Sequence, residues 1–418
     1  MKHSGIPWIG EIPVSWEVMP HKRVMHKVKE IQEHYNGEDI ISLTMRGVIV
    51  RDLDAGGKMP TSFDGYQKVY PNNLLQCLFD IDVTPRCVGL IKNEGLTSPA
   101  YSQFEMHSNA YAPYYDYLLR YMDDGKTLLH LSKNLRSSLT ETDFGAIDTC
   151  VPSIDEQQKI ASFLDRKCSE IDEMITLQEK IVEELKAYKQ SVITEAVTKG
   201  LNPDIPMKDS GIEWIGEIPE HWDTCKIKNS LEINPHQCHK LEEDTEVSYM
   251  PMECLRNGII EKRTALYGSL PSLTEFSDGD IVMAKVTPCF ENGNIAIATD
   301  LTNGVGFGSS EVFVFRCHDN TLSKYAFYYL QSPYIKARGV SSMTGTGGLK
   351  RINPHYLCDS VMVLPNRSEQ QEIAEYLDAK CVEIDNLISI KLSKIDNLKE
   401  YKKSIIYEYV TGKKEVFE

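Results

Sequence analysis

Two long segments of the chain place apolar residues at alternating spacings of four and three. This heptad spacing predicts helices that pack along an apolar seam, as in a coiled coil. Neither segment contains Pro or Gly between Pro152 and Gly200 or between Pro365 and Gly412. We therefore expect two helices of about 45 residues, roughly 65–70 Å long. The seam positions are Leu164, Cys168, Ile171, Ile175, Gln178, Val182, Leu185, Lys189 and Val192, and then Leu377, Cys381, Ile384, Ile388, Lys391, Ile395, Leu398, Lys402 and Ile405.

Polar residues interrupt the two seams at matching places. Gln178 corresponds to Lys391, and Lys189 corresponds to Lys402. Polar seam residues of this kind fix the register of a helix pair at some cost in stability. The middle residues, Gln178 and Lys391, would meet in a parallel or an antiparallel pair, so the pattern leaves the direction open. The helices are expected to form an intramolecular spacer, and an exposed face could also dock a partner subunit.

The chain is a duplication. SGIPWIGEIPVSW, from Ser4, and SGIEWIGEIPEHW, from Ser210, match at ten of 13 positions and contain all four Trp residues. EQQKIASFLDRKCSEIDEMI, from Glu156, and EQQEIAEYLDAKCVEIDNLI, from Glu369, match at 13 of 20 positions. Each half therefore consists of a Trp segment, an insert and a long helix. We expect a first domain over residues 1–151, a helix over 152–200, a linker and second domain over 201–364, and a helix over 365–414.

The inserts, residues 17–151 and 223–364, share little sequence. VYPNNLLQCLFDI and FSDGDIVMAKVTP place turn residues before apolar runs, which predicts short strands. The predicted fold class is α/β (α+β): two globular domains joined by two coiled-coil helices in a pseudo-twofold duplication. One frame with two unlike inserts indicates one task performed on two different targets.

Composition narrows the class of protein. The 418 residues, 41% hydrophobic and 25% charged, are typical of a soluble globular protein with two or more domains. Eleven Cys with no CxxC spacing favour reduced thiols, and no run is apolar enough for a membrane span, so we expect a cytoplasmic protein. The net charge of −16 argues against a surface generally adapted to nucleic acid, because phosphates require Lys and Arg.

Motifs for catalysis and metal binding are missing from the sequence. There is no GxGxxG, no GxxxxGK[ST], no HExxH and no CxxC pair. The HQCH run from His236 to His239 is too crowded for a closed tetrahedral site, so a surface loop is the favoured interpretation. Asp278 and Asp280, in SDGDI, are expected to form a turn. We therefore predict no catalytic residue and no metal ligand on this chain.

Two basic segments are candidates for phosphate contacts. Residues 320–358 contain no acidic residue and include TGTGGLKR, with Lys350 and Arg351. GKTLLHLSKNLRSSLT, at the same relative place in the first half, contains Lys126, Lys133 and Arg136. Glycine-rich backbone beside cations approaches phosphates closely. Flexible basic surface loops are the alternative explanation, but their recurrence before both helices favours DNA binding.

Further candidates lie in two strand-turn-strand pieces of the second insert. KVTPCFENGNIAIA contains Lys285, Asn292 and Asn294, and GFGSSEVFVF contains Ser309 and Ser310. The polar side chains could hydrogen-bond to base edges or only cap turns, and the sequence does not decide between these roles.

From residue 4 to 414 the chain resembles the specificity subunits of Type I restriction-modification enzymes. The paired SGIxWIGEIPxxW segments and EQQxIAxxLDxKCxEID helices are the specific features, with KVTPCFENG and GFGSSE as weaker ones. The resemblance implies that each insert recognises one half of a split DNA site and that the helices pack antiparallel and separate the half-sites. Because the inserts differ, the implied site has two unlike halves.

The resemblance also implies the partners. Two modification subunits, which bind S-adenosylmethionine and methylate adenine, would dock on the helices, restriction subunits would join them, and this chain would hold no cofactor. The expected coiled-coil and docking residues are Leu164, Ile171, Ile175, Val182, Leu185, Leu377, Ile384, Ile388, Ile395 and Leu398.

Other functions stay open at this point. The same design could serve a methylation-only or other DNA-modifying assembly, and the presence of a restriction subunit would separate these two possibilities. A coiled-coil scaffold without a DNA role and an enzyme with an unfamiliar active site are the remaining alternatives, and co-purification with a methyltransferase would exclude both.

Overall fold

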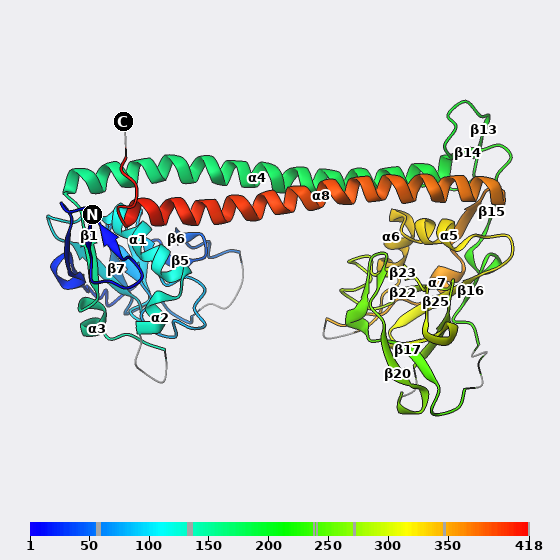
Figure 1. The fold of residues 1–418 in the computed structure, drawn as a ribbon, viewed down its shortest axis with the longest axis horizontal. Helices are drawn as coiled ribbons and strands as arrows, with labels where there is room; N and C mark the ends of the chain where they lie inside the picture. Colours follow the sequence, from blue (N-terminus) through cyan, green and yellow to red (C-terminus); the bar gives the residue numbers. More distant parts are fainter. Residues whose placement is uncertain are drawn as a thin grey trace. The chain divides into compact units, whose positions relative to one another are not determined.

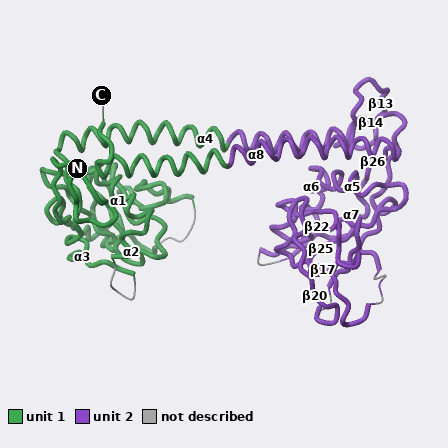
Figure 2. The backbone as a smooth tube through the Cα atoms, viewed as in Figure 1, with its two compact units in different colours: residues 1–179, 393–418 green, residues 180–392 purple. Residues whose placement is uncertain are grey.

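The computed structural model describes residues 1–55, 60–131, 137–236, 239, 241–270, 273–345 and 348–416. The chain forms two compact units, residues 1–179 with 393–418 and residues 180–392 (Figure 2). Each unit contains one domain of short strands and helices together with a stretch of both long helices (Figure 1). The units divide within the long helices, so the four-part division of the sequence stays a prediction about its repeats.

The domain of the first unit is built on a four-stranded antiparallel sheet. Asn72, with a positive φ of 66°, forms the turn that precedes strand β8, which is the apolar run predicted in VYPNNLLQCLFDI. All three residues of β8 are buried, so this strand lies in the domain core. The strand order is β4 (Met25–Val28), β11 (Ser102–Met106), β8 (Leu74–Gln76) and β9 (Val88–Leu90).

Four further strands form a second set in this domain. The hairpin of β5 (Ile41–Thr44) with β6 (Gly47–Val50) and the pair of β10 (Gly95–Thr97) with β7 (Gln67–Val69) are both antiparallel. A parallel bridge between Ile40 and Leu96 connects them in the order β6-β5-β10-β7. The other elements are β1 (Lys2–His3), β2 (Glu11–Ile12), β3 (Glu17–Pro20), η1 (His21–Arg23), α1 (Ala112–Asp124), α2 (Thr127–Leu131), α3 (Glu141–Gly145) and β12 (Asp148–Val151).

The domain of the second unit has two four-stranded sheets. One has the order β16 (Leu231–Ile233), β25 (Val312–Cys317), β22 (Ile281–Ala284) and β23 (Ile295–Ile297). The other has the order β20 (Arg263–Leu266), β17 (Glu246–Met250), β24 (Val305–Gly308) and β21 (Thr274–Ser277). The other elements are β13 (Met207–Asp209), β14 (Glu217–Pro219), β15 (Asp223–Lys226), η2 (Ile227–Asn229), η3 (Met252–Cys254), β18 (Leu255–Arg256), β19 (Ile259–Ile260), η4 (Tyr267–Ser269), η5 (Thr302–Gly304), α5 (Ser323–Leu330), α6 (Pro333–Ser341), α7 (Pro354–Cys358) and β26 (Val361–Leu364).

The two inserts have the same strand topology although they share little sequence. The order β16-β25-β22-β23 repeats β4-β11-β8-β9, and β20-β17-β24-β21 repeats β6-β5-β10-β7. The repetition includes the parallel contact, which is between β17 and β24 in the second domain. Equivalent strands such as β8 and β22 are buried at every position in both domains, so different apolar residues can build the same frame. The duplication therefore extends through the inserts.

Both predicted long helices are present. Helix α4 spans Ile154–Lys199, 46 residues, and α8 spans Arg367–Val410, 44 residues. Of the ten seam residues expected to form the coiled coil, Leu185, Ile388 and Leu398 are half-buried and the other seven are buried. No helix in the described part of the chain is long and apolar enough to cross a membrane.

The helices run antiparallel within each unit, which settles the direction that the pattern left open. In the first unit, Lys402 of α8 forms an ion pair with Asp172 of α4 at 2.6 Å. In the second unit, Lys189 of α4 forms the equivalent pair with Asp385 of α8 at 2.7 Å. Both pairs are partly exposed, so each contributes at most about 1 kcal/mol. Both pairs involve the polar seam positions Lys189 and Lys402, whose role in fixing the register stays a prediction.

Each Trp segment contacts the start of one long helix and the glycine that follows the end of the other. The Nε1–H of Trp16 donates to Glu156 Oε1 at 2.8 Å, at the start of α4. A Cβ added to Gly412, just after α8, would lie 3.0 Å from Trp16 Cη2. In the second unit, Trp222 donates to Glu369 at 3.2 Å, and a Cβ on Gly200 would lie 3.1 Å from the Trp222 ring. The Trp segments therefore have a structural role, because they contact the start of one long helix and the end of the other.

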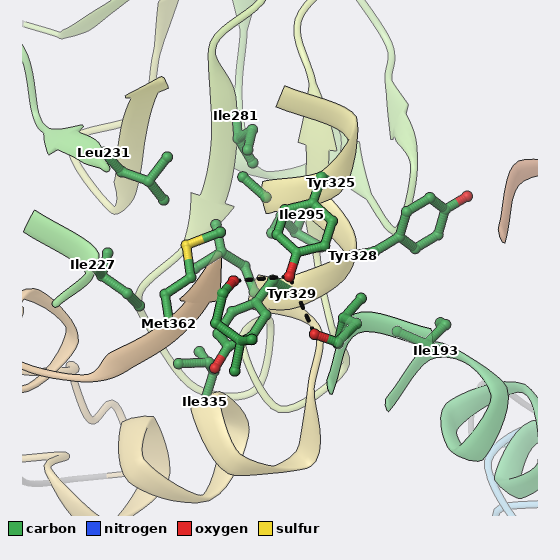
Figure 3. Packing of buried hydrophobic residues seen from close by; sticks show 14 of the residues in the cluster. Ile193, Ile227, Leu231, Ile281, Ile295, Tyr325, Tyr328, Tyr329, Ile335 and Met362 are labelled. Atoms are coloured by element: carbon green, nitrogen blue, oxygen red, sulfur yellow. Dashed lines mark hydrogen bonds between the residues drawn. The ribbon is translucent and has the colours of Figure 1, made fainter. Parts of the chain in front are cut away.

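A buried tyrosine in each domain contacts the last turn of a long helix. The Tyr325 hydroxyl donates to the Val197 carbonyl of α4 at 3.1 Å and lies 2.8 Å from that of Val363 in β26 (Figure 3). In the first unit, the Tyr114 hydroxyl donates to the Val410 carbonyl of α8 at 2.9 Å. These bonds satisfy carbonyls that a helix end leaves without an intrahelical partner. Each domain is therefore attached to the end of the helix that follows the other domain in the sequence.

At one equivalent buried position, the first frame has a histidine and the second an isoleucine. His21, in η1, is fully buried, with Nδ1 3.2 Å from the Phe144 carbonyl and Nε2 without a hydrogen-bond partner among the described residues. Burial lowers the pKa of His21 to about 4, because the charged imidazole would be desolvated. The equivalent residue of the second domain, in η2, is Ile227, which is also fully buried.

We expect the first unit to lose stability as the pH falls from 6.5 towards 4, because the unfolded chain then binds a proton that folded His21 does not. At pH 5 the loss is about 2 kcal/mol. Urea unfolding of the wild type and His21→Ile, at pH 7.5 and pH 5, measures it. The variant should lack this part of the pH dependence, and His3→Ile, an exposed histidine, is the control. Equal pH dependence in the wild type and His21→Ile would contradict the prediction.

Candidate nucleic-acid interface

The basic TGTGGLKR segment of the second unit forms a hairpin. Thr344 and Arg351 exchange two backbone hydrogen bonds, at 3.0 and 2.8 Å, and so form its neck. Gly345 has a φ of 141°, and an added Cβ would lie 3.1 Å from Lys350 Cα, so only glycine fits there. Residues 346 and 347 are outside the described residues. The predicted residues Lys350 and Arg351 lie on one arm of this hairpin, and both are exposed.

This hairpin is bound to the connection between β22 and β23. The backbone N–H of Thr287 donates to the Lys350 carbonyl at 3.0 Å, and the N–H of Ile352 donates to the Lys285 carbonyl at 2.9 Å. The Thr287 hydroxyl also donates to the Gly348 carbonyl at 2.9 Å and accepts from the Lys350 N–H at 2.9 Å. The structure thus brings together two segments, TGTGGLKR and KVTPCFENG, that are distant in the sequence.

The cations of this hairpin and of the β22–β23 connection have different surroundings. Arg351 donates two hydrogen bonds to the Glu311 carboxylate, at 2.9 and 2.7 Å. These bonds raise the pKa of Arg351 and lower that of Glu311. Lys285 lies over the Phe313 ring, 5.8 Å from its centroid. Within the described part of the chain, the Lys350 ammonium is in no ion pair, so it is the cation most available to a phosphate.

The remaining polar candidates of the second insert lie elsewhere or cap turns. The Ser309 hydroxyl accepts from the Glu311 N–H at 3.1 Å and so caps the turn before β25, while Ser310 is exposed beside it. Asn292, exposed, and Asn294, buried, line a cavity of about 150 Å³ together with Gln190 of α4, Phe290 and Lys336. The candidates therefore form two sites rather than one.

In the first insert the structure describes one of the three predicted cations. Lys133 and Arg136 lie outside the described residues. The Lys126 ammonium donates to the carbonyls of Ile81 and Thr84, at 3.4 Å each. Lys126 therefore supports the connection between β8 and β9, and its contact with a phosphate stays a prediction.

That connection, residues 77–87, was missed by sequence reasoning. It is the topological equivalent of the β22–β23 connection, and it binds the segment before β12 in the same way. The Leu139 N–H donates to the Leu78 carbonyl at 2.8 Å, and the Ile81 N–H donates to the Ser137 carbonyl at 3.1 Å. The signal that could have found it is the tripeptide Val-Thr-Pro, present at residues 83–85 and 286–288. Val83, which lies in this connection, is 74% exposed.

The structure describes no metal site. Among the described residues there is no group of three or more His, Cys, Asp or Glu side chains that could hold a metal ion. Within the HQCH run, Gln237 and Cys238 are outside the described residues, and His239 Nδ1 lies within hydrogen-bond distance of Glu275 Oε1, at 2.8 Å.

Comparison with known proteins gives similar sequences among curated proteins, although no family model matches the chain. The specificity subunit of the Type I restriction enzyme EcoEI, from Escherichia coli, is 28% identical over 222 residues, 52% of this chain and 37% of that protein. The EcoAI specificity subunit, also from E. coli, is 32% identical over 162 residues, which are 38% of this chain and 27% of that protein. The putative MjaX specificity subunit from Methanocaldococcus jannaschii is 28% identical over 317 residues, which are 73% of this chain and 69% of that protein. The matched segments thus span less than two thirds of the two E. coli relatives.

Solved structures have the same fold over nearly the whole chain. A chain from a study of complex assembly and conformational transition of the type I R-M system has a TM-score of 0.71 at 13% identity, covering 96% of this chain and 98% of its own. The HsdS subunit from Thermoanaerobacter tengcongensis has a TM-score of 0.54 at 15% identity, and the match covers 99% of this chain and 100% of that subunit. The predicted fold class is confirmed. In sequence and in fold, this chain is similar to the specificity subunits of Type I restriction-modification systems, as its paired motifs predicted.

Proposed function

We propose that this chain is the DNA-recognition and scaffold subunit of a Type I restriction-modification complex. Each domain recognises one half of an asymmetric, bipartite DNA site, and the helix pair sets the spacing between the halves. The observation that supports this most directly is the pair of domains with one strand topology and unlike connections, each attached to the helices in the same way. Such a design fits one task on two different targets.

In this proposal the chemistry belongs to the partners. Two modification subunits bind S-adenosylmethionine and methylate adenine, restriction subunits join them, and this chain supplies no catalytic residue and no cofactor site. The ten described cysteines are all free thiols, which supports assembly in the reducing cytoplasm.

Base-resolution mapping of methylated adenine in cells with and without this chain tests the proposal. We expect an asymmetric motif of two half-sites with a fixed gap, present only when the chain is produced. A palindromic motif, or an unchanged methylation pattern, would contradict it. Purification of the chain with its partners then shows whether a restriction subunit joins or whether the assembly only methylates.

The second domain is proposed to contact phosphates through the Lys350 hairpin. We expect Lys350→Ala to weaken DNA binding by the assembled complex about two- to tenfold and to lower the salt slope by about one ion. Arg351→Ala should weaken binding more, because it also leaves Glu311 unpaired near a phosphate. Equilibrium binding over a salt titration measures both, with Lys208→Ala, in β13, as the control. An unchanged salt slope for Lys350→Ala would exclude this phosphate contact.

The long helices are proposed to dock the modification subunits through side chains outside the seam. Leu177 of α4 is 55% exposed, and its equivalent in α8, Ile390, is 62% exposed. Met174 and Leu387, one turn earlier, are exposed as well. Exposed apolar side chains at equivalent places in both repeats are typical of a surface that binds the same partner twice. The predicted seam residues are buried or half-buried, so they support this surface rather than form it.

We expect Leu177→Glu and Ile390→Glu each to remove one modification subunit, and the double variant to remove both. A carboxylate in an apolar interface costs roughly 3 kcal/mol, about a hundredfold in affinity. Native mass spectrometry of the purified complexes measures the stoichiometry, with Val14→Glu as an exposed control in the Trp segment. Two modification subunits on every variant would place docking elsewhere.

A further inference from the structure

Gln157 is a fully buried glutamine in the first turn of α4. Its Oε1 accepts a hydrogen bond from the Tyr111 backbone N–H at 2.7 Å. Its Nε2 donates to the carbonyls of Asn109 at 2.9 Å and Pro152 at 3.0 Å. The side chain therefore joins the start of α4 to the segment that leads into α1 and to the end of the preceding strand.

Gln370, at the equivalent place in α8, makes the same three bonds in the second unit. It is fully buried, and its Oε1 accepts from the Leu322 N–H at 2.8 Å. Its Nε2 donates to the carbonyls of Asn320 and Pro365, both at 2.9 Å. The bonded groups flank α5 and β26 just as those of Gln157 flank α1 and β12.

The chemistry of these bonds requires a glutamine. A primary amide supplies one acceptor and two donors at once, and each amide here uses all three on buried backbone groups. An apolar substitute would leave those groups unpaired, and a carboxylate would face two carbonyl oxygens. The next residue of each EQQ motif, Gln158 or Gln371, is exposed, so the two glutamines of the motif have different roles.

These glutamines form one of several attachment points of each domain, beside the bonds of Trp16 and Trp222 to the starts of the same helices. Another point is the tyrosine bond to the end of the other long helix, from Tyr114 to Val410 or from Tyr325 to Val197. A body held at one point can swivel, whereas two points fix its tilt. For a domain of this size, a tilt of roughly 10° moves a loop about 20 Å away by about 3.5 Å, close to the rise of one base pair.

We propose that Gln157 and Gln370 are positioning residues that set the tilt of each domain on the helix pair, and thereby the gap length that the complex accepts between half-sites. This inference rests on the proposed function. In this proposal, the gap depends on how the domains are attached to the helices as well as on the length of the helices. Weakening either glutamine broadens the range of accepted gaps, because the recognition loops of that domain then move along the DNA.

The test uses the full chain in complex with its modification subunits. The substrates are duplexes that contain the two mapped half-sites, with gaps from two base pairs shorter to two longer than the native gap. For Gln157→Leu we expect about tenfold slower methylation at the native gap and little change at gaps one base pair different, so that the gap preference falls about tenfold. Gln157→Asn, which keeps the amide on a shorter stem, should fold readily and give an intermediate preference, and Gln370→Leu should repeat the result.

Gln158→Leu, the same substitution at the exposed neighbour, is the matched control and should keep the native preference. Equal loss of methylation at every gap would show that Gln157 has only a structural role and would overturn the inference. An unchanged preference in Gln157→Leu and Gln157→Asn would overturn it as well. If the wild-type complex shows no preference for any gap, the proposed function itself fails, and that outcome is visible before any variant is compared.

Discussion

The rest of the structure depends on one constraint, which is that the C-terminal ends of the two long helices are buried against the domains. A helix end leaves backbone N–H or C=O groups without intrahelical partners, and burial without other partners is costly. Here Tyr114 and Tyr325 donate to carbonyls at these ends, whereas the helix starts are exposed and are capped locally by Ser153 and Asn366. Each domain must supply these groups in a fixed geometry, so its frame is constrained in a way that its connections are not.

This constraint explains how two domains of unlike sequence keep the same topology. The strands that lead to the helix contacts, β3 with β12 and β15 with β26, are paired identically in the two units. The connections between β8 and β9 and between β22 and β23 contact no helix end through these bonds, and they differ in length and charge. The connections can therefore differ without changing the attachment to the helices, which is what a protein with two different targets requires.

The sequence predicted the parts of the fold that depend on local or periodic signals. The heptad seam predicted α4 and α8, and the repeated Trp segments predicted the duplicated frame. The shared topology of the inserts could not be predicted, because strands such as β8 and β22 are three or four residues long and pair with distant segments. The roles of the candidate cations were equally hidden. Lys126 and Arg351 are basic in sequence, but their bonds to the Ile81 carbonyl and to Glu311 arise only from the tertiary fold.

The bond from Tyr114 to Val410 also bears on how the chain folds during synthesis. Val410, in the segment of α8 that completes the attachment of the first domain, follows Tyr114 by 296 residues. At about 5–20 residues per second, a ribosome needs roughly 15–60 s to make that segment. Throughout this interval the pocket for the end of α8, next to Trp16 and Pro13, has no helix to fill it. The nascent first domain therefore exposes apolar surface for longer than the second, whose α4 partner is made beforehand, and it is the half of the molecule that most needs chaperone protection.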